Sequence, residues 1–119
     1  MAVLTKDAIL KAEDLERKLV TVKEWGGDVY VRSMTAAERD DWEAGLMASK
    51  TEDAKSNLRN LRARLTVICV VDEAGNRLFS DADAEALGQK SARAVDRIFS
   101  AAARLNALSS RDVEDLAGN

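Results

Sequence analysis

LRNLRARLTVICVV, residues 58–71, is the stretch that decides the fold. Leucine or isoleucine recurs in it every three or four residues, which is the spacing of one face of an α-helix. These residues are Leu58, Leu61, Leu65 and Ile68. From Val67 to Val71 every residue is apolar, so we expect this end to be buried on all sides. We favour a helix because no Gly or Pro interrupts the pattern. A buried β-strand is the alternative, because the apolar run is short and rich in valine.

The composition is typical of a small globular domain. The chain has 119 residues, of which 46% are hydrophobic and 33% are charged, so we expect one domain with one modest core. We predict an α+β fold that is mainly α, in which one N-terminal β-hairpin packs on a small helical domain. This single domain should span residues 1–108. The acidic segment 109–119 has little to bury, so we expect it to be a frayed tail.

The residue inventory argues against catalysis and against a metal site. The chain contains no histidine, which removes the commonest general base near neutral pH and the commonest metal ligand. The single cysteine, Cys69, has apolar neighbours that favour a core residue over a nucleophile. Acidic residues cluster at 72–73, 81–83 and 112–115, in turns or caps, where we expect solvated carboxylates. We therefore expect no enzyme activity and no cofactor.

Charge and hydropathy also limit the kinds of partner. The net charge is -3 at pH 7, and no stretch is basic enough to dominate binding to nucleic acid. The N-terminus lacks the apolar segment of a signal peptide, and no run approaches the ~20 apolar residues of a membrane span. We expect a cytoplasmic protein without nucleic-acid or membrane partners.

A β-hairpin is predicted in the first third of the chain, where valines alternate with polar residues on both sides of a Gly pair. We expect Gly26 and Gly27 to form a two-residue turn that places Val22 opposite Val31. All four valines then share one face, namely Val20, Val22, Val29 and Val31. The opposite face carries Tyr30 and is left to solvent or a partner.

Capping patterns predict where the first two helices begin. Thr5 can cap a short helix that runs to about Glu13. Thr35 and Glu38 have the spacing of a capping box, in which each side chain bonds the backbone amide of the other. The helix that starts there should place Trp42 and Leu46 on its inner side.

The last two helices are predicted in the same way. Ser80 and Asp83 repeat the capping spacing for a short helix through Leu87, which we expect a left-handed Gly88 to stop. Ser91 caps the final long helix. Its apolar stripe should belong to the core and consists of Val95, Ile98, Phe99, Ala102, Leu105 and Leu108.

Four residues are candidates for contacting a partner. Trp25, beside two glycines at the hairpin tip, is either folded back on the core or held out as an interface anchor. Tyr30 lies on the outer face of the hairpin, whose edge can accept a peptide. Arg59 and Arg62 belong to a basic segment, residues 55–64, without any acidic residue. This segment is either a solvated helix face or a contact for an acidic partner.

Four motifs in a fixed order carry a resemblance to a known family. They are EWGGDVYVR at 24–32, TAAERD at 35–40, NLRARL at 60–65 and VDEAGNRLFSD at 71–81. The likeness covers most of the chain, roughly residues 5–108. In this order they resemble the tail assembly chaperones of long-tailed, non-contractile bacteriophages and prophages.

The resemblance implies a binding protein. A chaperone of this family coats the hydrophobic, helical tape measure protein before the tail tube polymerises around it. The expected partners are the tape measure protein, a frameshifted longer form of the chain and, beyond these, the tail tube protein and further copies of the chain. The resemblance places the protein in the host cytoplasm and not in the mature virion.

Two other functions remain open from the sequence. One is a phage-encoded regulator that binds nucleic acid through the basic face of residues 55–64. The other is a structural minor component of the tail, which would be retained in the virion.

Overall fold

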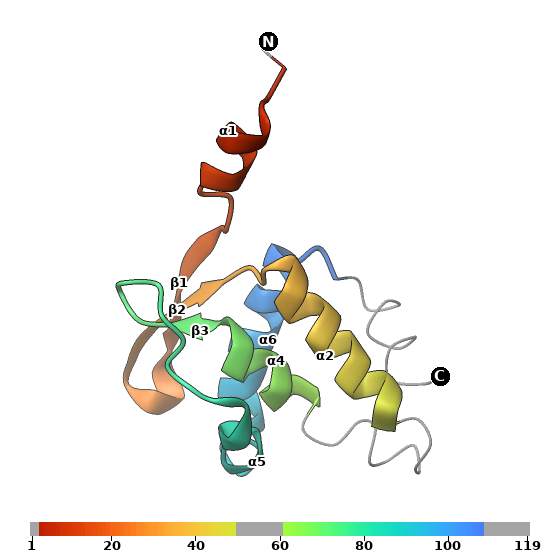
Figure 1. The fold of residues 1–119 in the computed structure, drawn as a ribbon. Helices are drawn as coiled ribbons and strands as arrows, with labels where there is room; N and C mark the ends of the chain where they lie inside the picture. Colours follow the sequence, from red (N-terminus) through yellow and green to blue (C-terminus); the bar gives the residue numbers. More distant parts are fainter. Residues whose placement is uncertain (1–2, 50–60, 109–119) are drawn as a thin grey trace.

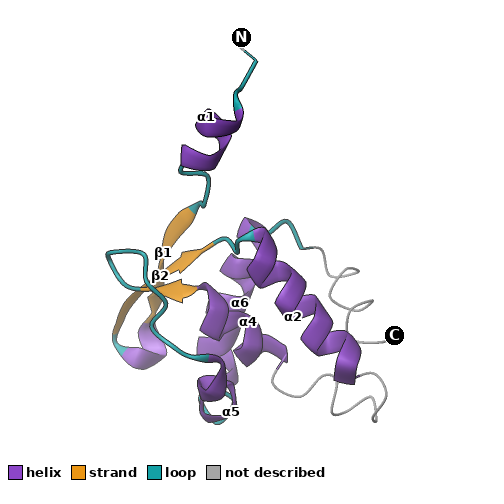
Figure 2. Cartoon of the chain, in the orientation of Figure 1, coloured by secondary structure: helices purple, strands orange, loops and turns teal. Residues whose placement is uncertain are grey.

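Three antiparallel strands form a sheet that is packed against helices (Figures 1 and 2). The computed structural model describes residues 3–49 and 61–108, without the side chains of residues 46–49. The strands are β1 (Arg17–Val22), β2 (Gly27–Arg32) and β3 (Val70–Val71), in the spatial order β1, β2, β3. The mainly α, α+β class predicted from the sequence is confirmed.

The helices begin close to the residues that the capping patterns predicted. They are α1 (Lys6–Lys11), α2 (Ala36–Ser49), α4 (Leu61–Cys69), α5 (Ala84–Leu87) and α6 (Ala92–Leu105). Two short 3₁₀ helices, η1 (Lys23–Trp25) and η2 (Asp81–Asp83), complete the described elements. Among the described helices, none combines the length and the apolar character needed to cross a bilayer.

The central segment is a helix over most of its described length and a strand at its end. Each of the two interpretations of its sequence is therefore right for a part of it. Residues 61–69 are helical, and seven of these nine side chains are buried. Val70 and Val71 then turn into β3 and pair with Val31 and Tyr30 of β2. The helix prediction is therefore right up to Cys69 and wrong for the last two valines. Residues 58–60 lie outside the described part of the chain.

The valine face of the hairpin is confirmed. Val22 and Val31 are fully buried, and Val20 and Val29 pack against the core. Helix α6 covers this face of β1 and β2 (Figure 1). Strand alternation therefore directs the other face, which carries Tyr30, away from α6.

The predicted two-residue turn is wrong. The 3₁₀ helix η1 and a left-handed Gly26, with φ of 75°, connect the two strands. Val22 consequently pairs with Gly27, and Val20 pairs with Val29. The valines still share one face because this shift in pairing is an even number of residues.

The apolar stripe of α6 belongs to the core, as predicted. Ile98 and Ala102 are fully buried, and Val95 is nearly so, while Phe99 is only partly buried. Beyond the helix, Leu108 closes the same cluster. The predicted C-terminal tail, residues 109–119, lies outside the described part of the chain.

Local capping differs from the predictions in two details. The Ser80 and Asp83 capping box is present, but Gly88 is right-handed, with φ of -62°. The amides of Gln89 and Lys90 bond the carbonyls of Ala86 and Leu87, so the chain leaves α5 through further tight turns without a left-handed residue. Helix α1 begins at the Thr5 cap as predicted and ends at Lys11, two residues early.

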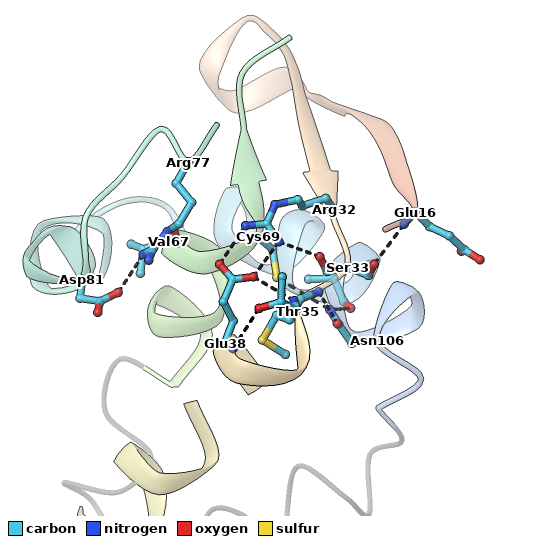
Figure 3. A network of polar contacts seen from close by, with 12 residues as sticks. Glu16, Arg32, Ser33, Thr35, Glu38, Val67, Cys69, Arg77, Asp81 and Asn106 are labelled. Carbon is cyan, nitrogen blue, oxygen red and sulfur yellow. Dashed lines mark hydrogen bonds and ion pairs between the residues drawn. The ribbon is translucent and has the colours of Figure 1, made fainter. Parts of the chain in front are cut away.

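A polar network joins the end of β2 to the start of α2 (Figure 3). The Arg32 guanidinium donates two hydrogen bonds to the Glu38 carboxylate, at 2.7 and 2.8 Å. The same carboxylate accepts from the Thr35 amide at 2.9 Å, and Thr35 Oγ1 accepts from the Glu38 amide at 3.1 Å. The predicted capping box is therefore confirmed, and Arg32 extends it into a tertiary contact.

Asn106 ties the end of α6 to the same corner. Its Oδ1 accepts from the buried Met34 amide at 2.7 Å, and its Nδ2 donates to the Ala102 carbonyl at 2.8 Å. The Arg39 guanidinium donates to the Asn106 carbonyl at 3.0 Å. One buried amide side chain thus links the β2–α2 connection to α6.

Replacing Glu38 with glutamine should lower the free energy of unfolding by about 1–2 kcal/mol at neutral pH, because hydrogen bonds to charged groups are stronger than neutral ones. Arg32 holds the pKa of Glu38 below its ordinary value of 4.5. The contribution is therefore present above that value and lost as the pH falls through the lower folded pKa. Urea unfolding at neutral and acidic pH measures both effects.

The matched control is Glu16→Gln, because the Glu16 carboxylate points away from this network (Figure 3). Its stability should stay close to that of the wild type. If wild type and Glu38→Gln lost stability equally on acidification, the assigned role of Glu38 would be wrong.

The variant Asn106→Ala should lose about 1–3 kcal/mol of stability, because the buried Met34 amide would have no acceptor. Asn76→Ala is the control, since the Asn76 side chain is exposed and forms no hydrogen bond to the described residues. Thermal unfolding compares the two variants. Equal stability losses would contradict the proposed role of Asn106.

Candidate functional site

Cys69 is a buried core residue in this fold. Its thiol is fully buried, and Asn106 Nδ2 donates a hydrogen bond to Sγ at 3.8 Å. Burial raises the pKa of the thiol to about 12. The nucleophilic thiolate is therefore disfavoured in the folded protein, as the sequence predicted.

The carboxylates considered for acid–base chemistry serve turns and caps. Asp72 accepts hydrogen bonds from the amides of Ala74 and Asn76, and Asp83 accepts from the Ser80 amide. Asp81 pairs with the Arg77 guanidinium at 2.8 Å. Within the described residues, no three acidic or cysteine side chains gather closely enough to hold a metal ion. The acidic residues at 112–115 lie outside the described part.

A hollow of about 300 Å³ lies between α2 and α4. Trp42 and Ile68 contribute to its apolar wall, and Asp41 and Arg64 stand at its rim. The indole Nε1 of Trp42 is buried without an acceptor in the described part of the chain. The described lining residues of the hollow therefore offer an apolar surface and one buried, unused donor, and they include no cysteine, serine or threonine.

Trp25 is held partly out of the protein, at 38% exposure. It lies in η1, and its neighbour Glu24 accepts two hydrogen bonds from Arg97 of α6, at 2.8 and 3.1 Å. This pair holds the pKa of Glu24 below its ordinary value. The indole is therefore presented from a segment that is tied down to α6, and its role as an interface anchor stays a prediction.

Arg62 belongs to α4 and contacts the same turn of α6. It is 60% exposed, pairs with Asp96 at 2.6 Å and places its guanidinium 5.6 Å from the centre of the Phe99 ring. Asp96 and Arg97 are consecutive, so one turn of α6 holds both Arg62 and the segment of Trp25. We call Trp25, Arg62 and Phe99 the α6 shoulder.

Tyr30 belongs to a different surface. The Arg17 guanidinium stacks on its ring at 4.3 Å and donates to the Glu73 carbonyl at 2.8 Å. Leu19 and Leu78 are exposed beside it, at 50% and 53%. A hollow of about 450 Å³ on the sheet face that α6 leaves free is lined in part by Leu19, Tyr30 and Leu78. We call it the outer-sheet hollow.

The structure therefore divides the predicted partner-binding residues. Trp25 and Arg62 flank α6, Tyr30 lies on the other side of the sheet, and Arg59 falls outside the described residues. Sequence reasoning missed Leu19 and Leu78. The available indication was an apolar leucine at a position of β1 that alternation directs outward.

A known protein family matches nearly the whole chain. Residues 4–119 match the sequence model of a family described as phage tail assembly chaperone. The fold is similar to the structure of the bacteriophage HK97 tail assembly chaperone, with a TM-score of 0.61 and 22% sequence identity. This similarity covers 83% of the chain and 94% of the HK97 chain, and at this identity it concerns the fold. No curated protein sequence matches the chain.

Cys69 should resist alkylation in the native protein. Because its thiol is buried and its pKa is raised to about 12, iodoacetamide at neutral pH should modify it at least about 100-fold more slowly than in the unfolded chain. Mass spectrometry with and without urea measures the two rates. Native labelling as fast as unfolded labelling would contradict the structural role.

Proposed function

Because the chain belongs to the phage tail assembly chaperone family, we propose that it binds the tape measure protein and keeps it soluble while the tail is assembled. Members of this family act as chaperones, which is a non-catalytic role. A long apolar helix aggregates in water unless its surface is covered. A small domain with exposed apolar side chains beside charged ones can cover such a surface reversibly.

The family match over residues 4–119 carries this proposal. The α6 shoulder supports it, because it combines the properties of a helix-binding surface. Trp25 supplies a large apolar ring held by a tied segment, and Phe99 adds apolar area that is only partly buried. Arg62 lies over the Phe99 ring with most of its own side chain exposed. It can therefore meet polar groups at the margin of a bound helix.

Reversibility favours weak individual contacts. A chaperone that leaves before the particle is complete cannot bind each segment tightly, whereas many copies along one tape measure protein bind strongly together. The proposal places this action in the host cytoplasm, with the protein absent from the mature virion. It includes a frameshifted longer form that shares this domain, and the tail tube protein as the partner that replaces the chaperone.

Substitutions in the α6 shoulder should weaken binding of the tape measure protein. Trp25→Ala removes the anchor and should lower the affinity by about tenfold or more. Arg62→Glu, which also loses its pairing with Asp96, should have a smaller effect in the same direction. Co-expression with the tape measure protein, followed by measurement of its soluble and co-purifying fractions, tests both variants.

Two controls match these substitutions. Lys23→Ala changes an exposed side chain of the same 3₁₀ helix, and Arg93→Glu makes the same charge change at an exposed position of α6. Both should behave like the wild type. Unchanged co-purification with Trp25→Ala would remove the shoulder from the proposal. Failure of the wild type to co-purify with or solubilise the tape measure protein would overturn the function itself.

A further inference from the structure

The hollow of about 300 Å³ between α2 and α4 is a surface separate from the α6 shoulder. We call it the α2–α4 hollow. Helix α4 packs against both α2 and α6. Arg62, on the shoulder, and Arg64, at the hollow, are two residues apart and therefore point about 200° apart around α4. The apolar wall of the hollow consists of Trp42, Val67, Ile68 and Ala84.

Trp42 leaves a hydrogen-bond donor unused in this wall. The residue is 4% exposed, and its indole Nε1 is buried with no acceptor among the residues that the structure describes. Buried groups of this kind are rare, because they have lost their hydrogen bonds to water. The atom is covered in the free protein, so an incoming acceptor reaches it when the indole turns into the open space beside it. An occupant that brings an acceptor therefore removes a cost that the free protein carries.

Two charged groups at the rim of the hollow are also unused. The Arg64 guanidinium is half-buried, and the Asp41 carboxylate is exposed. Over the described ranges, neither side chain forms an ion pair or a hydrogen bond. The third charged residue of the lining, Asp81, is already paired with Arg77. The rim therefore offers donors at Arg64 and acceptors at Asp41.

Gly45 keeps the α2 side of the hollow open. It follows Asp41 and Trp42 by four and three residues, so the three positions share one face of α2. A Cβ atom built at Gly45 would have no heavy atom of the surrounding described chain within 4 Å. This position therefore leaves room for a side chain that another molecule supplies.

The unused groups match the main chain of an extended polypeptide. A residue in an extended segment has a free carbonyl oxygen, to which Trp42 and Arg64 can donate. It also has a free N–H group, from which Asp41 can accept. A helical segment has already bonded these groups internally, except at its ends. The apolar wall can at the same time cover one large side chain.

We infer that the α2–α4 hollow binds an extended polypeptide segment, with one large apolar side chain of that segment against Ile68. Trp42 and Arg64 donate to its carbonyl oxygens, and Asp41 accepts from its N–H group. This occupant differs in conformation from the apolar helix proposed for the α6 shoulder. The inference goes beyond the proposed function, and its test needs neither the shoulder nor the tape measure protein.

The test uses a blocked peptide, acetyl-Ser-Thr-Leu-Thr-Ser-amide, whose threonines favour an extended chain. The small size of the hollow predicts a dissociation constant of about 1 mM, so the titration runs to about 10 mM. The two tryptophans of the full-length chain each give an indole N–H resonance in a proton–nitrogen correlation spectrum, and Trp25→Phe identifies them. The Trp42 resonance should move downfield with added peptide, while the Trp25 resonance should stay in place.

Gly45→Leu fills the hollow from α2 and should abolish the response of the Trp42 resonance. Leucine favours a helix over glycine, so this variant should be at least as stable as the wild type. Ala44→Leu is the matched control, because it adds the same side chain at the neighbouring exposed position, and it should respond like the wild type. Arg64→Met should bind the peptide about tenfold more weakly. Urea unfolding checks that all variants are folded.

Two further peptides define the occupant. A peptide with alanine in place of leucine should bind at least about tenfold more weakly, because it buries less apolar surface. An alanine-rich helical peptide with one leucine should leave the Trp42 resonance unchanged. A fixed Trp42 resonance in the wild type, a response that survives in Gly45→Leu, or an equal response to the helical peptide would each overturn the inference.

Discussion

The burial of the apolar end of the central segment is the constraint on which the rest of the structure depends. Residues 67–71 have no polar side chain to present to water, so they must be enclosed by other elements on every side. Their backbone amides and carbonyls must also be bonded. The chain meets both needs by changing from α4 to β3 at Val70, where β2 supplies the bonding edge. Arg77 closes the end of the helix by donating to the Val67 carbonyl (Figure 3).

This arrangement joins two layers that are weak separately. A two-stranded hairpin is marginal in water, and β3 adds a third strand that is anchored in the helical core. Helix α6 then buries the valine face, and the Arg32 and Glu38 pair with Asn106 fastens the connection that follows β2. The single cysteine thiol of the chain, that of Cys69, is buried in the core.

Two exposed surfaces lie on opposite sides of the sheet. The α6 shoulder lies on the helical side, and the outer-sheet hollow lies on the side that α6 leaves free. Under the proposed function, the α6 shoulder meets a segment of the tape measure protein. Many copies along one extended partner then add individually weak contacts to stable but reversible coverage.

The sequence by itself determined the features that depend on bonds between near neighbours. The Thr35 and Glu38 capping box and the valine alternation of the hairpin follow from spacings of two or three residues, and the residue inventory pointed away from catalysis. Only the tertiary structure decided where α4 becomes β3, because the free edge of β2 comes from a segment far away in the sequence. It also decided that Trp25 and Tyr30 lie on different surfaces and that Leu78 and Leu19 line one hollow. Such proximity depends on how the layers pack, which no local pattern encodes.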